Sequence, residues 1–258
     1  MTQLGSMLAA GQTPPRGTVA ITFDDGYLDT LRIAAPILDE AGLPATVYLP
    51  TWYIDRAKPQ WVDELFGIFT SRRAQQLVTE CGTWNLSNDH AARAAQVELN
   101  RVLLEASLDA RERLLGQVRE SLKPSGESPR LTMNWDEVRE LVRRFPRIEL
   151  GAHTVHHLDL RRWTGIEAER EISASAATIE RETHVRPRHF SFPYGRRCEE
   201  TRNMVQQAGF ETAVGAGSKV LLGPASDRWA LPRIEGHVSV PALKFLTSGA
   251  YTGLPWVV

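Results

Sequence analysis

Short apolar runs of strand length alternate with segments of helical periodicity along most of this chain. The strand-like runs cover residues 18–23, 44–50, 147–153, 188–193 and 211–217, with a last strand-like piece over 229–240. Helical patterns lie between them, over 29–42, 135–145, from about 164, and over 199–209. Strands that are separated by helices pair in parallel, because a parallel connection needs a long crossover. The alternation therefore predicts an α/β fold built on a parallel sheet, closed or open.

One block interrupts this rhythm. Residues from about 58 to 130 carry helical patterns without intervening strands: one over 63–78 and a longer one whose apolar positions run from Val97 to Leu122. We interpret the block as a helical insertion within a single domain that covers residues 1–258, and not as a separate domain.

The overall charge and hydropathy argue against two classes of partner. The chain has 30 basic and 31 acidic residues, so no strong field attracts nucleic acid or an anionic membrane surface. No apolar run reaches the 18 residues of a membrane-spanning helix, and the first residues lack the pattern of a signal peptide. The sequence thus predicts a protein without an integral membrane segment or a nucleic-acid partner, located by default in the cytoplasm.

Polar residues follow three of the predicted strands. They stand in "TFDDGY" (22–27), "GAHTVHH" (151–157) and "FSFPYG" (190–195). In parallel α/β folds the carboxyl ends of the strands share one face, and functional sites are built there. We therefore expect these three segments to meet.

The second segment carries a pair of histidines with metal-ligand spacing. His153 and His157 are four residues apart, which places both rings on one side of a helical or tight turn. Two imidazoles and one carboxylate form a common ligand set for a catalytic zinc ion, with at least one position left for water. The alternative is a pair of surface or hydrogen-bonded histidines.

The first segment supplies the carboxylates. Adjacent acids at the end of a buried strand repel each other, and a cation offsets that cost by stabilising the ionised form of one of them. The other acid can remain free as the base that acts on water. Asp24 and Asp25 are the candidates for these two roles, whereas a solvated turn containing Gly26 would need neither.

In this order and spacing, the three segments resemble the first three motifs of the polysaccharide deacetylases (carbohydrate esterase family four, the NodB homology domain). The resemblance extends over roughly residues 17–238. It implies a distorted (β/α)7 barrel with the NodB-like deacetylase fold, here carrying the helical insertion. It also implies a metal-dependent hydrolase that removes acetyl groups from N-acetylated sugars.

The resemblance also assigns individual roles. Asp24 matches the catalytic base, and Asp25, His153 and His157 match the metal ligands. Tyr194 matches a substrate-binding residue whose backbone N–H stabilises the oxyanion. We expect a divalent ion, zinc first, with cobalt, manganese or nickel as other occupants of a two-histidine, one-carboxylate site.

Two departures from the family pattern affect the catalytic residues. Many members carry an arginine after the phenylalanine of the third motif, where this chain has Ser191. Arg233, in "LPRIEG", is our candidate for a replacement cation that orients the base. His237, four residues further on, is the candidate general acid, because alternation along a strand would put it on the same face.

Other functions fit parts of the same pattern. The chain could hydrolyse a non-sugar amide or a cyclic imide, bind glycans without catalysis, or use a metal for stability alone. Arg161 and Arg162, which closely follow the histidine segment, could meet an anionic group of a substrate or lie in a solvated loop. The aspartate pair and the histidine pair together favour a deacetylase whose partner is an N-acetylated saccharide.

Overall fold

The computed structural model describes residues 1–15, 17–126, 128–216, 222–223, 225–234, 236 and 239–247. The chain forms two compact units. The first combines Met1–Arg56 with Met133–Val258, and the second is Ala57–Thr132. The bounds of the second unit lie close to those predicted for the helical insertion, while a single domain over residues 1–258 stays a prediction.

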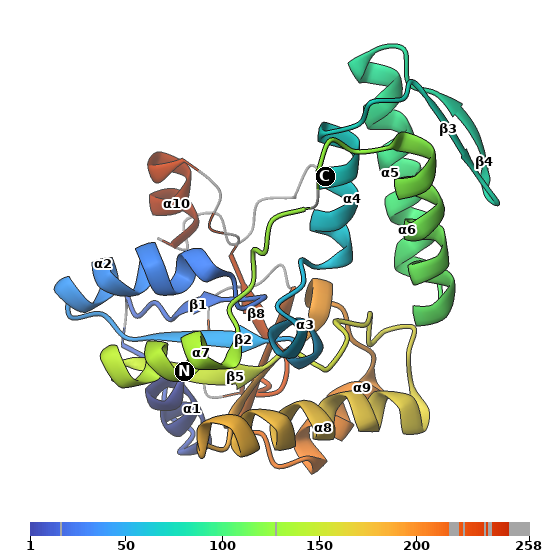
Figure 1. Cartoon of the computed structure of the whole chain (residues 1–258). Helices are drawn as coiled ribbons and strands as arrows, with labels where there is room; N and C mark the ends of the chain where they lie inside the picture. Colours follow the sequence, from blue (N-terminus) through green and yellow to red (C-terminus); the bar gives the residue numbers. More distant parts are fainter. Residues whose placement is uncertain are drawn as a thin grey trace. The chain divides into compact units, whose positions relative to one another are not determined.

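A six-stranded parallel sheet organises the first unit. Its strands, in spatial order, are β1 (Ile21–Phe23), β2 (Ala45–Leu49), β5 (Ile148–Ala152), β6 (His189–Ser191), β7 (Thr212–Ala216) and β8 (Leu231–Arg233). Figure 1 shows helices flanking this sheet, which curls into a half-barrel. The α/β fold class predicted from the alternation is confirmed, with six parallel strands found in the described residues.

The strand register brings the functional segments to one edge of the sheet. Phe23 pairs with Val47, and Val47 pairs with Leu150, so β1, β2 and β5 are aligned across the sheet. Further along the sheet, Ala152 pairs with Phe190. The segments that follow Phe23, Ala152 and Ser191 therefore emerge together at the carboxyl ends of the strands, as predicted.

The helices of this unit follow from local signals and from the core that they cover. They are α1 (Thr2–Ala9), the π-helical turn η1 (Thr30–Ala34), α2 (Ala35–Glu40), α3 (Thr51–Arg56), α7 (Trp135–Arg144), α8 (Gly165–Thr183), the 3-10 turn η2 (Pro193–Gly195), α9 (Glu199–Gln207) and α10 (Val240–Thr247). A capping box between Asn134 and Glu137 begins α7 and satisfies two backbone donors. All five residues of β2 are buried, as expected for a strand with helices on both faces.

The second unit is mostly helical but contains a hairpin that the sequence analysis missed. It consists of α4 (Trp61–Thr70), the antiparallel pair β3 (Gln76–Thr79) and β4 (Gly82–Asn85), α5 (Asp89–Glu105) and α6 (Leu108–Leu122). The helix predicted to continue to residue 78 therefore ends at Thr70. Alternating burial in β4 shows the period-two pattern of a strand, which is too short to stand out from the surrounding helical signals.

The single long helix predicted between Val97 and Leu122 is two helices. Its apolar spacing continues through the break, but Ser107 adopts an extended conformation and its side chain accepts a hydrogen bond from the backbone N–H of Ala110. A serine N-cap of this kind starts a new helix. Apolar periodicity alone cannot distinguish one helix from two consecutive helices that cover the same core.

The end of the chain also differs from the prediction. Among the described residues of the range 229–240, where a strand was expected, only β8 is a strand, and α10 begins at Val240. His237 lies outside the described residues. None of the helices in the described part of the chain combines the length and apolar character needed to cross a membrane.

We predict that a buried histidine in the sheet makes stability depend on pH. Burial lowers the pKa of His189 to about 4, and its ring contacts the hydroxyls of Thr2 and Thr212 at 3.0 and 2.8 Å. Between pH 4 and 6.5, His189 binds a proton in the unfolded chain but remains neutral in the folded chain. The contribution of neutral His189 to the free energy of unfolding is therefore complete above pH 6.5 and is lost as the pH falls toward 4. We expect a loss of roughly 2–3 kcal/mol from this group.

Urea unfolding of the wild type and of His189→Gln at pH 7.0 and 4.5 measures this contribution. The variant should lose less stability than the wild type on acidification. His90→Gln removes an exposed histidine and should retain the wild-type slope. Equal slopes for His189→Gln and the wild type would contradict the assignment.

Candidate metal and catalytic site

The two aspartates lie in the turn that follows β1. Asp25 has φ 71° and Gly26 has φ 61°, so both adopt the left-handed conformation immediately after the strand. A Cβ atom on Gly26 would lie 2.7 Å from Ile54 and 2.9 Å from Leu49. Glycine is therefore required here by both conformation and space. The turn directs two consecutive carboxylates into different surroundings.

The histidines lie in the loop that follows β5. His153 and His157 are buried, and the loop contains two positive φ values, 64° at Thr154 and 54° at His157. Left-handed conformations in non-glycine residues persist only where neighbouring structure holds them, and they concentrate at functional sites. The i, i+4 pair thus comes from an irregular loop and not from a helix.

Glu171 holds this loop in place. One of its carboxylate oxygens accepts hydrogen bonds from the backbone N–H groups of Val155 and His156, at 3.0 and 2.8 Å. The other oxygen contacts Nδ1 of His156 at 2.6 Å. Sequence analysis missed this residue, although an acid on the mostly apolar buried face of α8, beside Ala168 and Ile172, was the available signal.

Three potential ligand atoms converge. Nε2 of His153 and Nε2 of His157 lie 3.7 and 3.3 Å from Oδ1 of Asp25, and one ligand atom from each of the three residues lies within 4.8 Å of the others. Donors about 2 Å from one ion stand roughly 3–4 Å apart in a tetrahedral site. The spacing of these three side chains therefore fits a single metal ion.

A hydrogen bond fixes the orientation of one of the rings. Nδ1 of His153 lies 2.7 Å from the backbone carbonyl of Ser191. A carbonyl only accepts, so Nδ1 carries the proton and Nε2 presents its lone pair to the carboxylates. Outer contacts of this kind set the tautomer of metal-binding histidines.

Asp24 has a different set of neighbours. Arg233 donates to both of its oxygens, at 2.7 and 2.6 Å, and the hydroxyl of Ser191 donates to one of them at 3.2 Å. Burial by itself raises the pKa of Asp24, but the charge of Arg233 and the hydrogen bonds from Arg233 and Ser191 hold it below its ordinary value. Asp24 is therefore an ionised carboxylate at neutral pH, 3.7 Å from Nε2 of His153.

Ser191 thus occupies a positioning role that the sequence did not reveal. Besides donating to Asp24, its hydroxyl accepts a hydrogen bond from Arg233 at 3.0 Å. The absent motif arginine is therefore matched by a cation from another strand.

Tyr194 completes the group. Its ring lies 4.6 Å from that of His157 in an edge-on arrangement, and its φ is 58°. The structure therefore brings together six of the predicted site residues: Asp24, Asp25, His153, His157, Tyr194 and Arg233. The seventh, His237, falls outside the described residues and its role stays a prediction.

Comparison with known proteins agrees with this geometry. The family model "Polysaccharide deacetylase" matches residues 11–213, and the chain belongs to this family. Comparison with curated proteins gave no match.

Several solved structures share the fold. The Streptococcus pyogenes deacetylase PplD, in complex with acetate, aligns with a TM-score of 0.58 at 15% identity, covering 96% of this chain and 77% of that one. A de-N-acetylase from Aggregatibacter actinomycetemcomitans aligns with a TM-score of 0.55 at 16% identity, covering 95% of this chain and 80% of that one. The deacetylase domain of BpsB from Bordetella bronchiseptica aligns with a TM-score of 0.55 at 17% identity, covering 90% of this chain and 76% of that one. At these identities the comparisons establish the NodB-like fold.

The contacts of Glu171 generate a prediction about the metal site. Glu171→Ala removes the acceptor of two backbone N–H groups in the histidine loop, so the rings lose their common orientation. We expect Zn²⁺ to bind about 10–100-fold more weakly, the range typical for lost outer contacts. Competition with a chromophoric chelator measures this affinity at a temperature where circular dichroism shows the variant to be folded.

Glu169→Ala is the matched control. Glu169 is an exposed glutamate on the same helix and makes no side-chain contact with the loop among the described residues. It should bind Zn²⁺ like the wild type. If Glu171→Ala also retained wild-type affinity while folded, the loop would not depend on this carboxylate.

Proposed function

We propose that this protein is a metal-dependent hydrolase that removes acetyl groups from N-acetylated sugars. The observation that carries the proposal is the convergence of Asp25, His153 and His157, with Asp24 held beside them by Arg233. Family membership supports deacetylation and a carbohydrate substrate.

The donor set favours a divalent transition metal, with zinc as our first assignment. Two imidazoles and one carboxylate suit zinc, and cobalt, manganese and nickel fit the same ligands. When bound, such an ion polarises an amide carbonyl and lowers the pKa of a water molecule toward neutrality.

Asp24 is the proposed base. It stays ionised because Arg233 and Ser191 stabilise its charge, and the bidentate arginine fixes the direction of its oxygens. The carboxylate takes a proton from the attacking water as the oxygen adds to the amide carbon. The C–N bond then breaks, the nitrogen receives a proton, and acetate and a free amino sugar are released.

Two further residues have proposed roles around this step. The backbone N–H of Tyr194 is the proposed donor to the oxyanion, a kind of contact worth roughly 2.7–4 kcal/mol in hydrolases. His237 is the proposed source of the proton for the leaving amine. Arg233 acts through Asp24 as a positioning residue.

Two structural neighbours support the reaction class. One neighbour is described as a de-N-acetylase and another was solved with acetate, the product that the proposed reaction releases. We extend this chemistry to the present chain because its own carboxylates and imidazoles form a suitable site.

The test is acetate release by the purified, metal-analysed protein. We expect the protein to contain about one divalent ion per chain and to release acetate from acetylated chito-oligomers. It should lose this activity to a chelator and recover it with Zn²⁺. Small amides and a cyclic imide, assayed in parallel, should be hydrolysed far more slowly. Hydrolysis of the imide alone would overturn the substrate assignment, and metal content without turnover of any probe would overturn the enzymatic one.

Asp24→Asn separates catalysis from metal binding. The amide cannot accept the proton of the water, so we expect the turnover number to fall about 10²–10⁴-fold, the contribution typical of a general base. Metal content should remain close to one ion per chain, because Asp25 and the histidines are unchanged.

Asp29→Asn is the matched control, since Asp29 is exposed and makes no side-chain cap contact. It should retain full activity. Wild-type turnover in Asp24→Asn would exclude Asp24 as the base.

A further inference from the structure

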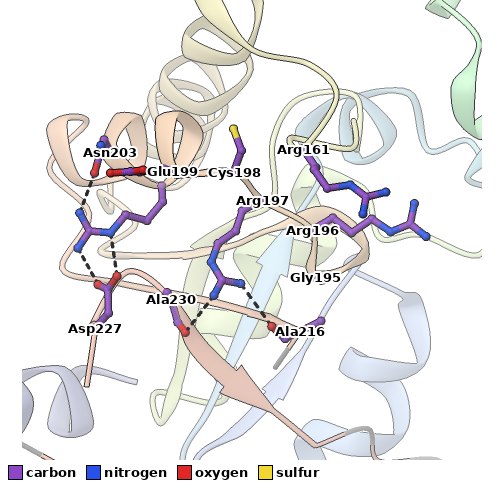
Figure 2. Close-up of a pocket in the computed structure, with 11 residues that line it drawn as sticks. Arg161, Gly195, Arg196, Arg197, Cys198, Glu199, Asn203, Ala216, Asp227 and Ala230 are labelled. Carbon is purple, nitrogen blue, oxygen red and sulfur yellow. Dashed lines mark hydrogen bonds and ion pairs between the residues drawn. The ribbon is translucent and has the colours of Figure 1, made fainter. Parts of the chain in front are cut away.

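A cavity rich in arginine lies next to the site. Its volume is about 660 Å³. It is lined by residues from the loop after His157, the segment that follows Tyr194, α9, the end of β7 and the segment that precedes β8. Four of the lining residues are arginines: Arg161, Arg196, Arg197 and Arg202. Figure 2 shows Arg161, Arg196 and Arg197 around the cavity.

Ring contacts connect the cavity to the candidate metal site. The guanidinium of Arg196 lies 5.9 Å from the centre of the Tyr194 ring, and that ring lies 4.6 Å from the ring of His157. Gly195, which directly follows Tyr194, is itself part of the cavity lining. A saccharide with its acetamido group at the metal site would therefore have this cavity as its neighbour.

Two of the four arginines already have carboxylate partners. Arg202 makes two hydrogen bonds to Asp227, at 2.9 and 2.8 Å, and Arg196 pairs with the buried Asp159 at 3.0 Å. Glu199, the other acid in the lining, is exposed. These pairs leave two arginines that could interact with a ligand.

Arg197 is the first of the two arginines that could interact with a ligand. Its guanidinium donates to the backbone carbonyls of Ala216 and Ala230, at 3.3 and 3.5 Å, and pairs with no carboxylate in the described part of the chain. Asp227 favours its charge from a distance, but both oxygens of that acid are bonded to Arg202. Burial lowers the pKa of Arg197, so an anion at this point would restore a favourable environment for its charge.

The neighbouring backbone leaves space for this side chain. A Cβ atom at Gly215 would lie 2.8 Å from Nη1 of Arg197. In Figure 2 the Arg197 side chain extends between the carbonyls of Ala216 and Ala230, held by the two dashed hydrogen bonds. Arg197 is thus an ordered cation on the cavity wall.

Arg161 is the second arginine that could interact with a ligand. It is exposed, and no side-chain ion pair involves it within the described ranges. Figure 2 shows Arg161 and Arg196 extending in the same direction from the cavity wall. Guanidinium groups recognise carboxylate and phosphate oxygens through paired N–H donors.

We infer that this cavity binds an anionic group, a carboxylate or a phosphate, carried by the same saccharide that is deacetylated. The inference rests on the proposed function and extends it to the class of substrate, an acidic glycan. Arg161 and Arg197 would contact the anion, whereas the charges of Arg196 and Arg202 are compensated by their carboxylate partners.

The experiment compares three matched oligomers: acetylated chitotriose, the same oligomer with a phosphate on one C6, and the same oligomer with that C6 oxidised to a carboxylate. We expect kcat/KM to be at least tenfold higher for the charged oligomers, through a lower KM. Whichever charged oligomer shows the larger increase in kcat/KM identifies the anion as a phosphate or a carboxylate. Equal values for all three oligomers would overturn the inference.

Arg161→Gln and Arg197→Gln test the residues. Each should reduce the ratio of kcat/KM for the charged oligomer to that for the neutral one by roughly tenfold, mainly through KM. Arg143→Gln removes an exposed arginine at the end of α7 and should leave the ratio unchanged. Equal losses on neutral and charged oligomers would show a structural role only. Arg197→Gln removes hydrogen bonds to the main chain and can therefore impair folding. In that case Arg161→Gln alone tests whether the cavity binds the anion.

A binding measurement separates this inference from the proposed function. Calorimetry with Asp24→Asn protein and the phosphorylated chitotriose needs no turnover, and tighter binding than for the neutral oligomer supports the cavity even if no acetate is ever released. Absence of acetate from every oligomer would refute the proposed function. Equal binding of charged and neutral oligomers would refute the cavity assignment alone.

Discussion

The ion pair between Asp24 and Arg233 joins the two ends of the sheet. Asp24 directly follows β1 and Arg233 ends β8, and these two strands are the opposite edges of the six-stranded order. A flat sheet would hold them about five strand spacings of 4.8 Å apart. Their bidentate contact at 2.7 and 2.6 Å therefore requires the sheet to curl until its edges face each other. The hydrogen bond from Arg233 to Thr22 within β1, at 3.4 Å, adds to the same closure.

This constraint also resolves the electrostatic problem of two adjacent acids. The two acids have separate partners: a guanidinium compensates the charge of Asp24, and Asp25 faces the two imidazoles of the candidate metal site. The left-handed conformation of Asp25 allows consecutive side chains to diverge in this way. A partly buried carboxylate without its cation would be unstable in the ionised form, because removing one partner of such a pair leaves an uncompensated charge. The pair thus serves the shape of the sheet and the ionisation of the proposed base together.

The main elements of the fold and the site were predictable because their signals are local. Apolar runs predicted the strands of the sheet. The positions of Asp25, His153 and His157 at strand ends predicted a group of candidate metal ligands, since parallel strands place these ends on one face. The contacts that hold those residues were less accessible. Ser191 lies far along the chain from Asp24, and nothing in its immediate neighbours indicates the contact. Glu171 is nearer to the loop that it binds, but its place on the buried face of α8 does not reveal which groups it contacts.

Errors in the second unit have a different origin. Apolar spacing records which residues face a core, and the core continues past the N-cap at Ser107, so the break between α5 and α6 leaves no gap in the pattern. The hairpin of β3 and β4 has four residues in each strand, the shortest length at which a period-two pattern indicates a strand. Periodicity therefore predicted the type of most elements better than their ends.

The segment "YGRRC" links the proposed catalytic site to the arginine cavity. Tyr194 faces His157, while the next four residues line the cavity, so one short stretch of backbone contributes to both. Gly195 has φ 65°, and a Cβ atom there would lie 2.4 Å from the backbone nitrogen of Ala216. Close packing of this turn on β7 therefore fixes Tyr194 and Arg197 relative to the same strand. A saccharide that used both would meet two sets of groups whose separation is set by the sheet and not by a flexible loop.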